Sequence, residues 1–429
     1  MGDDSVETRI IRVGAEGDGV GVLADGTSVY VPLSLPGELV RLGALTRRGG
    51  GRTGDSVSIL EENPDRDPDP PCAHFGDCGG CTLQHWRLPA YQDWKTGLLR
   101  AALTRAGYDD VEIAPLVSSP PRSRRRMDLA LRRVPNAVEV GLHRRQSSTI
   151  VDLTECHVLH PDLFALVAPL RDLLARSSLV RREGSIVVNL LDSGPDILLR
   201  TDIANPSPAD RRAMIAFAIG LGIPRISWVG GTETPEPICM PRPPVTTMSG
   251  VTVNPPPGTF LQATRDGEAA ILAAVVAGLP EKRTARSRVA ELYAGCGTIT
   301  FALAAQARVT AWEGDAAAIA ALRTAANHAG LAGRVEALHR DLVRQPLSAK
   351  DLSGFAAAVL DPPHAGAAML MDPIAAAKVP VVIYVSCNPA ALSRDAAVLR
   401  GAGYRLTKVT PIDQFVWSPR LESVSVFVR

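Results

Sequence analysis

A cysteine and two carboxylates occupy positions in this sequence where side chains often do chemistry. Cys387 follows the apolar segment VVIYVS and precedes NPAALSRDAAVLR, which has helical spacing, while Asp361 follows AAVL. A cysteine at the end of a strand can act as a nucleophile where a helix N-terminus or nearby donors favour its thiolate. Glu422, in RLESVSVF, stands beside the last strand and could serve as a general base. A structural interpretation stays open for each, because most single cysteines are buried packing residues and Glu422 could be a surface charge.

Such a thiol and carboxylate suit the methylation of a pyrimidine carbon. C5 of uracil is not electron-rich enough to attack a sulfonium methyl group, so a thiolate must first add to C6 and place the charge on C5. After methyl transfer a base must remove the C5 proton so that the thiolate can leave. Cys387 and Glu422 could supply these two functions, and Asp361 could hydrogen-bond the uracil edge.

A short glycine-containing turn could hold the methyl donor. Gly295, Gly297 and Thr298 follow the apolar segment RVAELY, where small residues let a backbone approach a ligand and a helix start offers free amide donors. The next strand ends in Glu313, about twenty residues after Tyr293, where a carboxylate can accept both ribose hydroxyls. A third strand ends in Asp341, placed to meet an adenine edge. A nicotinamide dehydrogenase would also satisfy the turn and the acid, but it normally has a third glycine that is absent here. The turn resembles the first motif of class I S-adenosylmethionine methyltransferases.

The elements that must position these residues begin near Phe260. Apolar strand candidates alternate there with Ala-rich helical segments, which predicts a mostly parallel sheet covered on both faces, with ligands at the carboxyl ends of its strands. The candidates are RVAELY, RVTAWEGD, RVEALHRD, AAVLDPP, VVIYVSC, YRLTKVTPID and SVSVFVR. The last two follow each other without a helix between them and could pair antiparallel. Asp361 and Cys387 then lie on the same rim as the glycine turn.

The part of the chain before Phe260 has a different pattern of apolar and turn-forming residues. A length of 429 residues predicts two or three domains. Short strands fill the first sixty residues, with a hairpin signal at Asp25-Gly26, and indicate a small barrel. A linker rich in Pro and acid, which we expect not to pack, follows at residues 61–71, and a helix is expected over residues 86–108. Residues 122–257 predict a mixed sheet with a helix near 161–175.

A cluster of cysteines lies between the barrel and the helix. Cys72, Cys78 and Cys81 are spaced closely enough for their sulphurs to converge, and Cys156 would be a fourth ligand. Four thiolates suit either zinc or a [4Fe–4S] cluster, and the chemistry alone leaves both open. The spacing is not that of radical S-adenosylmethionine enzymes. Cys239 and Cys296 have no evident partner and are interpreted as packing residues.

Charge and hydropathy limit the functional classes. The net charge is +1, but arginines dominate residues 122–145 and could neutralise RNA phosphates, unless they form a solvated basic face. No apolar stretch is long enough to span a membrane. The start MGDDSVETRI lacks the layout of a secretory signal, so we expect a cytoplasmic protein. No obligate protein partner is evident.

Four motifs together identify a resemblance. LYAGCGT, LDPPHAG, SCNPAALSRD and DQFVWSPRLESV resemble, in order and spacing, the RNA uracil-5-methyltransferase family. The resemblance implies that Cys387 is the nucleophile and Glu422 the proton acceptor. It assigns Gln262, Tyr293, Thr298, Glu313 and Asp361 to the cofactor and substrate pocket, with Phe260 near the target base. By their positions, Gly295 and Asp341 are further cofactor candidates, and Arg125 of the basic segment is a candidate substrate contact. The sequence departs from the family pattern at His364 and at residues 415–418.

The resemblance extends upstream and implies three domains. Residues 1–62 resemble a TRAM domain, an OB-like RNA-binding β-barrel, and Cys72, Cys78, Cys81 and Cys156 match the ligands of the family's iron-sulphur cluster, which favours [4Fe–4S] over zinc. A central α+β domain that carries the cluster would span residues 72–257, with the helix at 86–108 packing on the catalytic domain. A C-terminal α/β class I (Rossmann-like) methyltransferase domain, which binds S-adenosyl-L-methionine, would span residues 258–429.

The sequence indicates the RNA substrate less directly than it indicates the reaction. A TRAM domain and a cluster in one chain resemble the enzymes that act on large-subunit ribosomal RNA (23S rRNA), and tRNA is the alternative. A cytosine-5 methyltransferase and a non-catalytic TRAM-type RNA-binding protein are further alternatives. The surroundings of the cysteine disfavour the first, and the presence of both Cys387 and Glu422 disfavours the second. We expect the target uridine to lie in a loop or to be flipped out of its stack.

Overall fold

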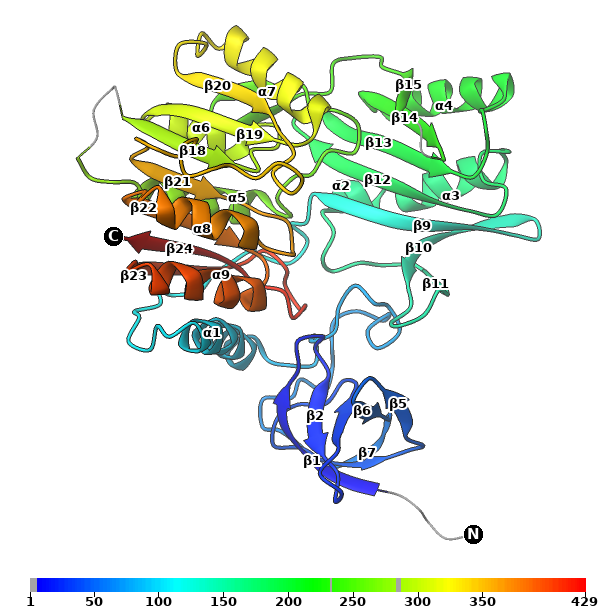
Figure 1. Ribbon diagram of the computed structural model, residues 1–429. Helices are drawn as coiled ribbons and strands as arrows, with labels where there is room; N and C mark the ends of the chain where they lie inside the picture. Colours follow the sequence, from blue (N-terminus) through cyan, green and yellow to red (C-terminus); the bar gives the residue numbers. More distant parts are fainter. Residues whose placement is uncertain (1–5, 232–233, 283–286) are drawn as a thin grey trace, which may run out of the picture. The chain divides into compact units, whose positions relative to one another are not determined.

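The chain divides into two compact units. The computed structural model describes residues 6–231, 234–282 and 287–429. The N-terminal unit comprises the described residues of Met1–Lys95, Leu142–His157 and Phe415–Pro419, and the larger unit comprises those of Thr96–Gly141, Val158–Gln414 and Arg420–Arg429 (Figure 1). The domain boundary expected near residue 257 therefore separates two sheets inside the larger unit.

Short strands form the sheet of the N-terminal unit, as the sequence predicts. Its seven strands are ordered β5-β6-β3-β2-β1-β4-β7. They are β1 (Val6–Val13), β2 (Gly19–Val22), β3 (Ser28–Val31), β4 (Leu39–Leu42), β5 (Thr46–Arg48), β6 (Gly51–Thr53) and β7 (Ser56–Glu61). The hairpin predicted at Asp25-Gly26 joins β2 to β3, with Gly26 at a φ of 82° and the Thr27 N–H donating to Asp25 Oδ1 at 2.9 Å. The first five residues of the range assigned to this domain lie outside the described residues.

The acidic linker packs against this sheet, contrary to the sequence-based expectation. Arg66 donates from Nε to Glu38 Oε1 at 2.6 Å, and Asn63 donates from Nδ2 to the Pro36 carbonyl at 2.7 Å. Glu38 is fully buried. A buried carboxylate is costly unless it is paired with a cation, so the linker must fold back to deliver Arg66. The composition of the linker could not predict this contact, because Glu38 and Arg66 lie 28 residues apart in the sequence.

The predicted helix and mixed sheet are both present. The helix is α1 (Leu88–Arg105), and the seven strands of the central sheet are ordered β11-β10-β9-β12-β13-β14-β15. These strands are β9 (Arg126–Val134), β10 (Ala137–His143), β11 (Ile150–Asp152), β12 (Glu183–Leu191), β13 (Gly194–Thr201), β14 (Arg225–Gly230) and β15 (Glu236–Cys239). The helix expected near 161–175 is divided into α2 (Pro161–Phe164) and α3 (Val167–Ala175), and α4 (Pro208–Gly220) lies beyond β13. A two-stranded sheet, β16 (Thr246–Met248) and β17 (Val251–Val253), follows.

The C-terminal sheet has the predicted alternation. Its eight strands are ordered β20-β19-β18-β21-β22-β24-β23-β8, and β18 to β22 are parallel. The strands are β8 (Val117–Ser118), β18 (Arg288–Leu292), β19 (Arg308–Glu313), β20 (Val335–His339), β21 (Ala357–Leu360), β22 (Val381–Ser386), β23 (Arg405–Asp413) and β24 (Glu422–Val428). β24 pairs antiparallel with both β22 and β23, as expected for the last two candidates. The edge strand β8, which precedes the central sheet in the chain, was not foreseen.

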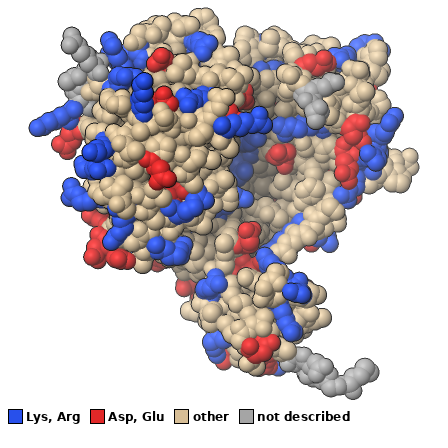
Figure 2. Space-filling view, in the orientation of Figure 1, with Lys and Arg blue, Asp and Glu red and all other residues tan. Residues whose placement is uncertain are grey.

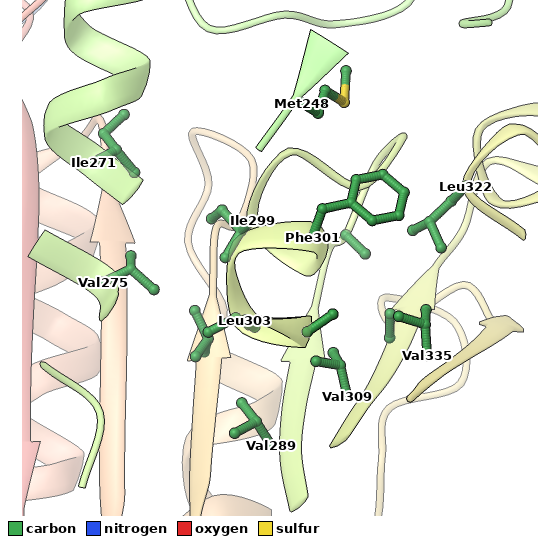
Figure 3. Close-up of a cluster of buried hydrophobic side chains, with 14 of the residues drawn as sticks. Met248, Ile271, Val275, Val289, Ile299, Phe301, Leu303, Val309, Leu322 and Val335 are labelled. Atoms are coloured by element: carbon green, nitrogen blue, oxygen red, sulfur yellow. The ribbon is translucent and has the colours of Figure 1, made fainter. Parts of the chain in front are cut away.

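Helices cover both faces of this sheet because successive strand residues point to opposite faces. On one face, Val289 and Ile383 pack with α5 (Arg265–Gly278), α6 (Thr298–Ala304) and α7 (Ala316–His328) (Figure 3). On the other face, the neighbouring residues Ala290 and Val382 pack with the end of α1, α8 (Ala368–Ala376) and α9 (Pro389–Gly401). Residues of α1 from Leu99 onward thus belong to the core of the C-terminal sheet, as predicted. None of the helices among the described residues has the length and apolarity that a membrane span requires.

One carboxylate is buried inside the sheet. Glu291 of β18 is 2% exposed, and its Oε2 has no hydrogen-bond partner among the described residues. Burial, with smaller contributions from the charges of Asp361 and Glu313, raises the pKa of Glu291 to about 8. The folded protein therefore holds this proton at pH values where the unfolded chain has lost it.

This difference predicts a pH-dependent effect of Glu291→Gln. Between about pH 4.5 and pH 8 the folded state binds the extra proton, so the unfolding free energy of the wild type falls with rising pH by at most about 1.4 kcal/mol per pH unit for this group. The unfolding free energy of the variant does not fall with pH in this way, because glutamine does not titrate. Denaturant unfolding at several pH values from 5 to 8 should show its stability relative to the wild type rising with pH, whereas parallel curves would contradict the assignment.

Candidate active site

Strand register places the candidate nucleophile opposite the candidate base. In the antiparallel pair β22 and β24, Ser386 faces Ser423. The next position outward therefore sets Cys387 opposite Glu422. Asp361 follows β21, whose last residue Leu360 pairs with Tyr384 of β22. The three predicted reacting residues thus belong to the adjacent strands β21, β22 and β24 and lie at the same end of these strands.

The residues after Cys387 begin helix α9. Asn388 is the N-cap, and its side-chain oxygen accepts from the Ala390 N–H at 3.0 Å. Pro389 occupies the first helical turn, where its missing N–H costs nothing. Cys387 therefore sits immediately before a capped helix start, as the sequence predicts.

The electrostatic setting of Cys387 differs from the expectation that the helix start favours a thiolate. Burial raises the pKa of Cys387 to about 11, the charges of Glu422 and Asp361 add to the effect, and Arg420 opposes it. In the free site the sulphur is therefore held as a thiol. Two carboxylates beside a thiol are nevertheless suitable groups for moving protons during catalysis.

A chain of hydrogen bonds connects the two carboxylates. Gln414 Nε2 donates to Glu422 Oε2 at 3.0 Å and to Gln262 Oε1 at 2.8 Å. Gln262 Nε2 donates in turn to Asp361 Oδ2 at 2.9 Å. Gln262, Gln414 and Glu422 are all less than 5% exposed. The sequence, through its family resemblance, pointed to Gln262, Asp361 and Glu422, but it gave no signal for Gln414.

Burial shifts the titration of both carboxyl groups. It raises the pKa of Asp361 to about 7, opposed by the hydrogen bond from Gln262. Burial and the charge of Asp361 raise the pKa of Glu422 to about 8, opposed by the hydrogen bond from Gln414. Glu422 Oε1 is buried and has no hydrogen-bond partner among the described residues. Glu422 Oε2 is thus held by a hydrogen bond, whereas Oε1 has no hydrogen-bond partner among the described residues.

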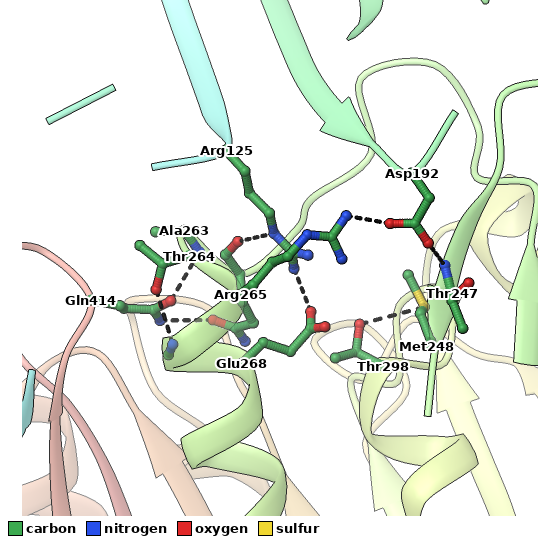
Figure 4. Close-up of polar contacts among 12 residues, drawn as sticks. Arg125, Asp192, Thr247, Met248, Ala263, Thr264, Arg265, Glu268, Thr298 and Gln414 are labelled. Atoms are coloured by element: carbon green, nitrogen blue, oxygen red, sulfur yellow. Dashed lines mark hydrogen bonds and ion pairs between the residues drawn. The ribbon is translucent and has the colours of Figure 1, made fainter. Parts of the chain in front are cut away.

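Arg125, a predicted substrate contact, is buried in the larger unit. It is 3% exposed, pairs through Nη2 with Glu268 Oε2, and donates from Nε to the Gln262 carbonyl at 3.0 Å (Figure 4). Its backbone N–H also donates to the Ala263 carbonyl at 2.9 Å. A buried guanidinium requires such partners. Arg125 therefore holds the segment that carries Gln262, and neither Arg125 nor Glu268 was foreseen in this role.

Other arginines of the predicted basic segment also make internal bonds. Arg126 donates from Nη1 to the Thr259 carbonyl at 2.8 Å, and Arg133 donates from Nη2 to the Ser177 carbonyl at 2.7 Å. Figure 2 shows positive and negative side chains interspersed on the visible face, with several positive ones beside a shaded hollow in the larger unit. Phe260, which follows the Thr259 carbonyl held by Arg126, is 69% exposed. An exposed ring of this size suits contact with a base.

The glycine turn and its candidate partners lie together. The Gly295 N–H donates to Glu313 Oε2 at 2.8 Å, and the N–H groups of Tyr293 and Ala294 donate to the Trp312 carbonyl at 3.0 and 3.1 Å. The Tyr293 hydroxyl is buried and has no hydrogen-bond partner among the described residues. Thr298 opens α6. A turn edged by a carboxylate and an orphaned hydroxyl fits a nucleoside-type ligand.

Asp341 lies close to the same turn. It follows β20, whose residue His339 pairs with Glu313 of β19. Its Oδ1 accepts from the N–H groups of Val343 and Arg344 at 2.9 and 3.1 Å. The predicted cofactor residues on β18, β19 and β20 are therefore brought to the same edge as the reacting residues.

The four candidate metal ligands share one neighbourhood in the N-terminal unit. The chain returns near Cys156, where the Thr154 N–H donates to His74 Nε2 at 3.0 Å and Glu155 accepts from the Ala73 N–H. Burial is the main cause that raises the pKa of Cys72, Cys78 and Cys81, and the charge of Cys156 raises each further. Within the described residues, however, no group of three or more His, Cys, Asp or Glu side chains is arranged to hold a metal ion. Cys296 is buried beside Thr259, consistent with packing.

The chain is similar to RNA methyltransferases over almost its whole length. The family described as tRNA (Uracil-5-)-methyltransferase matches residues 280–429. A protein of Brucella suis named an uncharacterized RNA methyltransferase is 40% identical over 423 residues, covering 99% of this chain and 98% of that protein. The 23S rRNA (uracil(1939)-C(5))-methyltransferase of Chromohalobacter salexigens is 32% identical over 430 residues, covering 98% of this chain and 88% of that protein.

A solved structure shares the fold. It is the Pyrococcus abyssi tRNA (uracil-54, C5)-methyltransferase in complex with S-adenosyl-L-homocysteine, with a TM-score of 0.75 and 20% identity over 98% of this chain and 100% of that one. At this identity the likeness concerns the fold alone. The class I methyltransferase fold predicted for the C-terminal part is thereby supported.

The glycine turn yields a prediction. Gly297 has a φ of 104°, and a Cβ there would lie 2.6 Å from the Phe301 ring. Gly297→Ala should lower stability by about 1–3 kcal/mol and weaken S-adenosylhomocysteine binding, because the turn must shift. Thermal melts and calorimetric titration would measure both. Gly333→Ala is the control, since no atom lies within 4 Å of its added Cβ; equal behaviour of the two variants would contradict the role of the turn.

Proposed function

The chain belongs to the RNA uracil-5-methyltransferase family and is an S-adenosylmethionine-dependent enzyme that methylates C5 of uridine in RNA; we propose that Cys387 is its nucleophile and Glu422 its general base. The observation that carries this assignment is the register of β22 and β24, in which Ser386 pairs with Ser423, so that Cys387 and Glu422 are the next residues outward on the two strands. The effect of the Glu422 charge on the pKa of Cys387 supports it, and so does the lack of a hydrogen-bond partner at Glu422 Oε1 among the described residues.

The proposed reaction proceeds by addition and elimination. The Cys387 sulphur adds as a thiolate to C6, and the electrons of the C5–C6 double bond pass to the uracil carbonyl as an enolate. The methyl donor supplies an electrophilic methyl group, which C5 takes. Glu422 Oε1 then removes the C5 proton, the C–H electron pair restores the double bond, and the C6–S pair leaves with the sulphur of Cys387. The thiolate and the carboxylate both become more abundant as pH rises, so catalysis should be faster above neutral pH.

Further residues of the larger unit complete the proposed site. Asp361, held by Gln262, hydrogen-bonds the uracil edge, and the exposed Phe260 contacts the target base. The donor's nucleoside lies along the turn with Tyr293, Gly295, Thr298, Glu313 and Asp341. The orphaned Tyr293 hydroxyl supports a bound polar ligand at this place.

We propose large-subunit ribosomal RNA as the substrate. The relative from Chromohalobacter salexigens, which is named for this activity, aligns with 98% of this chain, including the N-terminal unit. The match to the family named for tRNA covers residues 280–429 and so leaves out most of the N-terminal unit. The sheet of the N-terminal unit is proposed to act as the TRAM-type RNA-binding domain. Transfer RNA stays the alternative substrate.

We also propose that the four cysteines hold a [4Fe–4S] cluster. Their sulphurs lie near enough that the charge of Cys156 raises the pKa of the other three, which fits a set of four thiolate ligands. The match of these cysteines to the ligands of the family's cluster favours a [4Fe–4S] cluster over zinc, which would accept the same four thiolates. When bound, the cluster would cross-link the segments around Cys72 and Cys156.

Covalent trapping tests the proposed nucleophile. RNA substituted with 5-fluorouridine should form an adduct with the wild type and the methyl donor that survives denaturing electrophoresis, because fluorine cannot be removed as a proton. Cys387→Ala should form none, and Cys239→Ala, the control on β15, should form it normally. An adduct that persists in Cys387→Ala would overturn the assignment. Fragments of 23S rRNA should be trapped and tRNA should not; the reverse would favour the alternative substrate.

Metal analysis tests the proposed cluster. Protein purified without oxygen should contain about four iron and four sulphide per chain. Cys81→Ser should lose most of both, whereas Cys239→Ser, a matched variant outside the set, should keep them. Stoichiometric zinc in place of iron, or iron retained in Cys81→Ser, would contradict this proposal without affecting the assignment of the nucleophile.

A further inference from the structure

Gln414 occupies a place in the candidate site that none of the reacting residues explains. It lies just beyond β23 and is 2% exposed. Its three polar bonds are to different parts of the larger unit. Nε2 donates to Glu422 Oε2 and to Gln262 Oε1. Oε1 accepts from the Ala263 N–H at 2.9 Å (Figure 4). All the hydrogen-bonding capacity of its NH₂ group is thus used.

These bonds permit only one orientation of the Gln414 amide. The Ala263 backbone N–H can only donate, so the side-chain atom that faces it must be the oxygen. The NH₂ group must then face both Gln262 and Glu422. Reversing the amide would set two donors against each other at Ala263 and two acceptors against each other at Glu422, each at a buried position where an unmade bond is costly.

This fixed orientation determines where Glu422 can take up a proton. Glu422 Oε2 accepts from an NH₂ group that cannot turn away, so a proton on that oxygen would oppose another N–H. Glu422 Oε1 is buried with no hydrogen-bond partner among the described residues. A proton can therefore be accommodated on Oε1 and not on Oε2.

The packing around Gln414 leaves it no alternative position. Gly267 in the first turn of α5 lies against it, and a Cβ at that residue would come within 2.7 Å of the Gln414 Cβ. The Gly267 N–H is itself held by the Thr264 side chain at 3.0 Å, and Thr264 contacts the Ser119 hydroxyl at 2.7 Å. The glycine thus makes room for the glutamine, and a rigid capped helix start defines that room.

We propose that Gln414 is a positioning residue for the methylation reaction, which holds Glu422 so that Oε1 alone receives the C5 proton. Through Gln262 it also ties this base to Asp361, so the group that holds the uracil and the group that deprotonates it share one hydrogen-bonded chain. The inference rests on the proposed function. Gln414 touches no reacting atom in this account, and its effect passes through Glu422.

The proposal separates two steps of the reaction. Addition of the thiolate and methyl transfer precede deprotonation, so a misplaced base should slow only the release of the C5 proton. Gln414→Met keeps the size of the side chain and removes both N–H donors. Gly267→Ala moves Gln414 while keeping its amide. Gly220→Ala, at the end of helix α4, is the matched control, because no atom lies within 4 Å of its added Cβ.

The test is a single-turnover experiment with the full-length enzyme in excess. The RNA carries tritium at C5 of its uridines and the methyl donor carries ¹⁴C. For Gln414→Met and Gly267→Ala, ¹⁴C should enter an enzyme–RNA adduct stable to denaturation at nearly the wild-type rate. Tritium release should be slower by about 10-fold to 100-fold, which is less than the full contribution of a general base. Gly220→Ala should show no such separation.

Two results would overturn the proposal while the wild type stays active. One is an equal slowing of ¹⁴C incorporation and tritium release in Gln414→Met, which would mean that the residue serves folding alone. The other is wild-type tritium release in that variant. Failure of the proposed function looks different, because the wild type itself would then release no tritium and form no adduct with this RNA.

Discussion

The antiparallel pairing of β24 with β22 is the constraint on which the site depends. The register that sets Ser386 opposite Ser423 also sets Cys387 opposite Glu422, one step beyond the pair. A shift of this register by one residue would turn the glutamate to the opposite face of the sheet, because side chains alternate along a strand. Both strands are buried along almost their whole length, between the helices of the two faces, which fixes the register firmly. The apolar core of the larger unit thereby determines the geometry of the reacting groups.

Polar side chains within this apolar core connect the two carboxyl groups of the candidate site. Asp361, Gln262, Gln414 and Glu422 form a chain of hydrogen bonds in surroundings that raise the pKa of both terminal carboxyl groups to about 7 and 8. Such a chain is stable only when its members are satisfied. Its buried oxygen without a partner among the described residues, Glu422 Oε1, is where the proposed reaction requires an acceptor. The ion pair of Arg125 with Glu268 supports the chain from outside by holding the segment of Gln262.

The sequence predicted the elements well and the buried contacts poorly. Strand-end positions placed Asp361, Cys387 and the glycine turn on one rim, because the carboxyl ends of parallel strands share an edge. Arg125 was expected to contact the substrate, since nothing in RSRRRM shows that its partner Glu268 lies 143 residues away. The packing of Arg66 on Glu38 and the role of Gln414 were missed for the same reason. Each depends on a pairing between distant segments, which local patterns of charge and hydropathy do not record.

The central claim is that the sulphur of Cys387, and no other, bonds to the pyrimidine. Tandem mass spectrometry of the trapped complex, after digestion with nuclease and protease, tests it most directly. The account predicts a methylated nucleotide attached to the peptide that contains SCNPAALSR, with fragment ions that locate the added mass on Cys387. A nucleotide found on Cys296, which lies in the neighbouring cofactor turn, or on any other residue would contradict it.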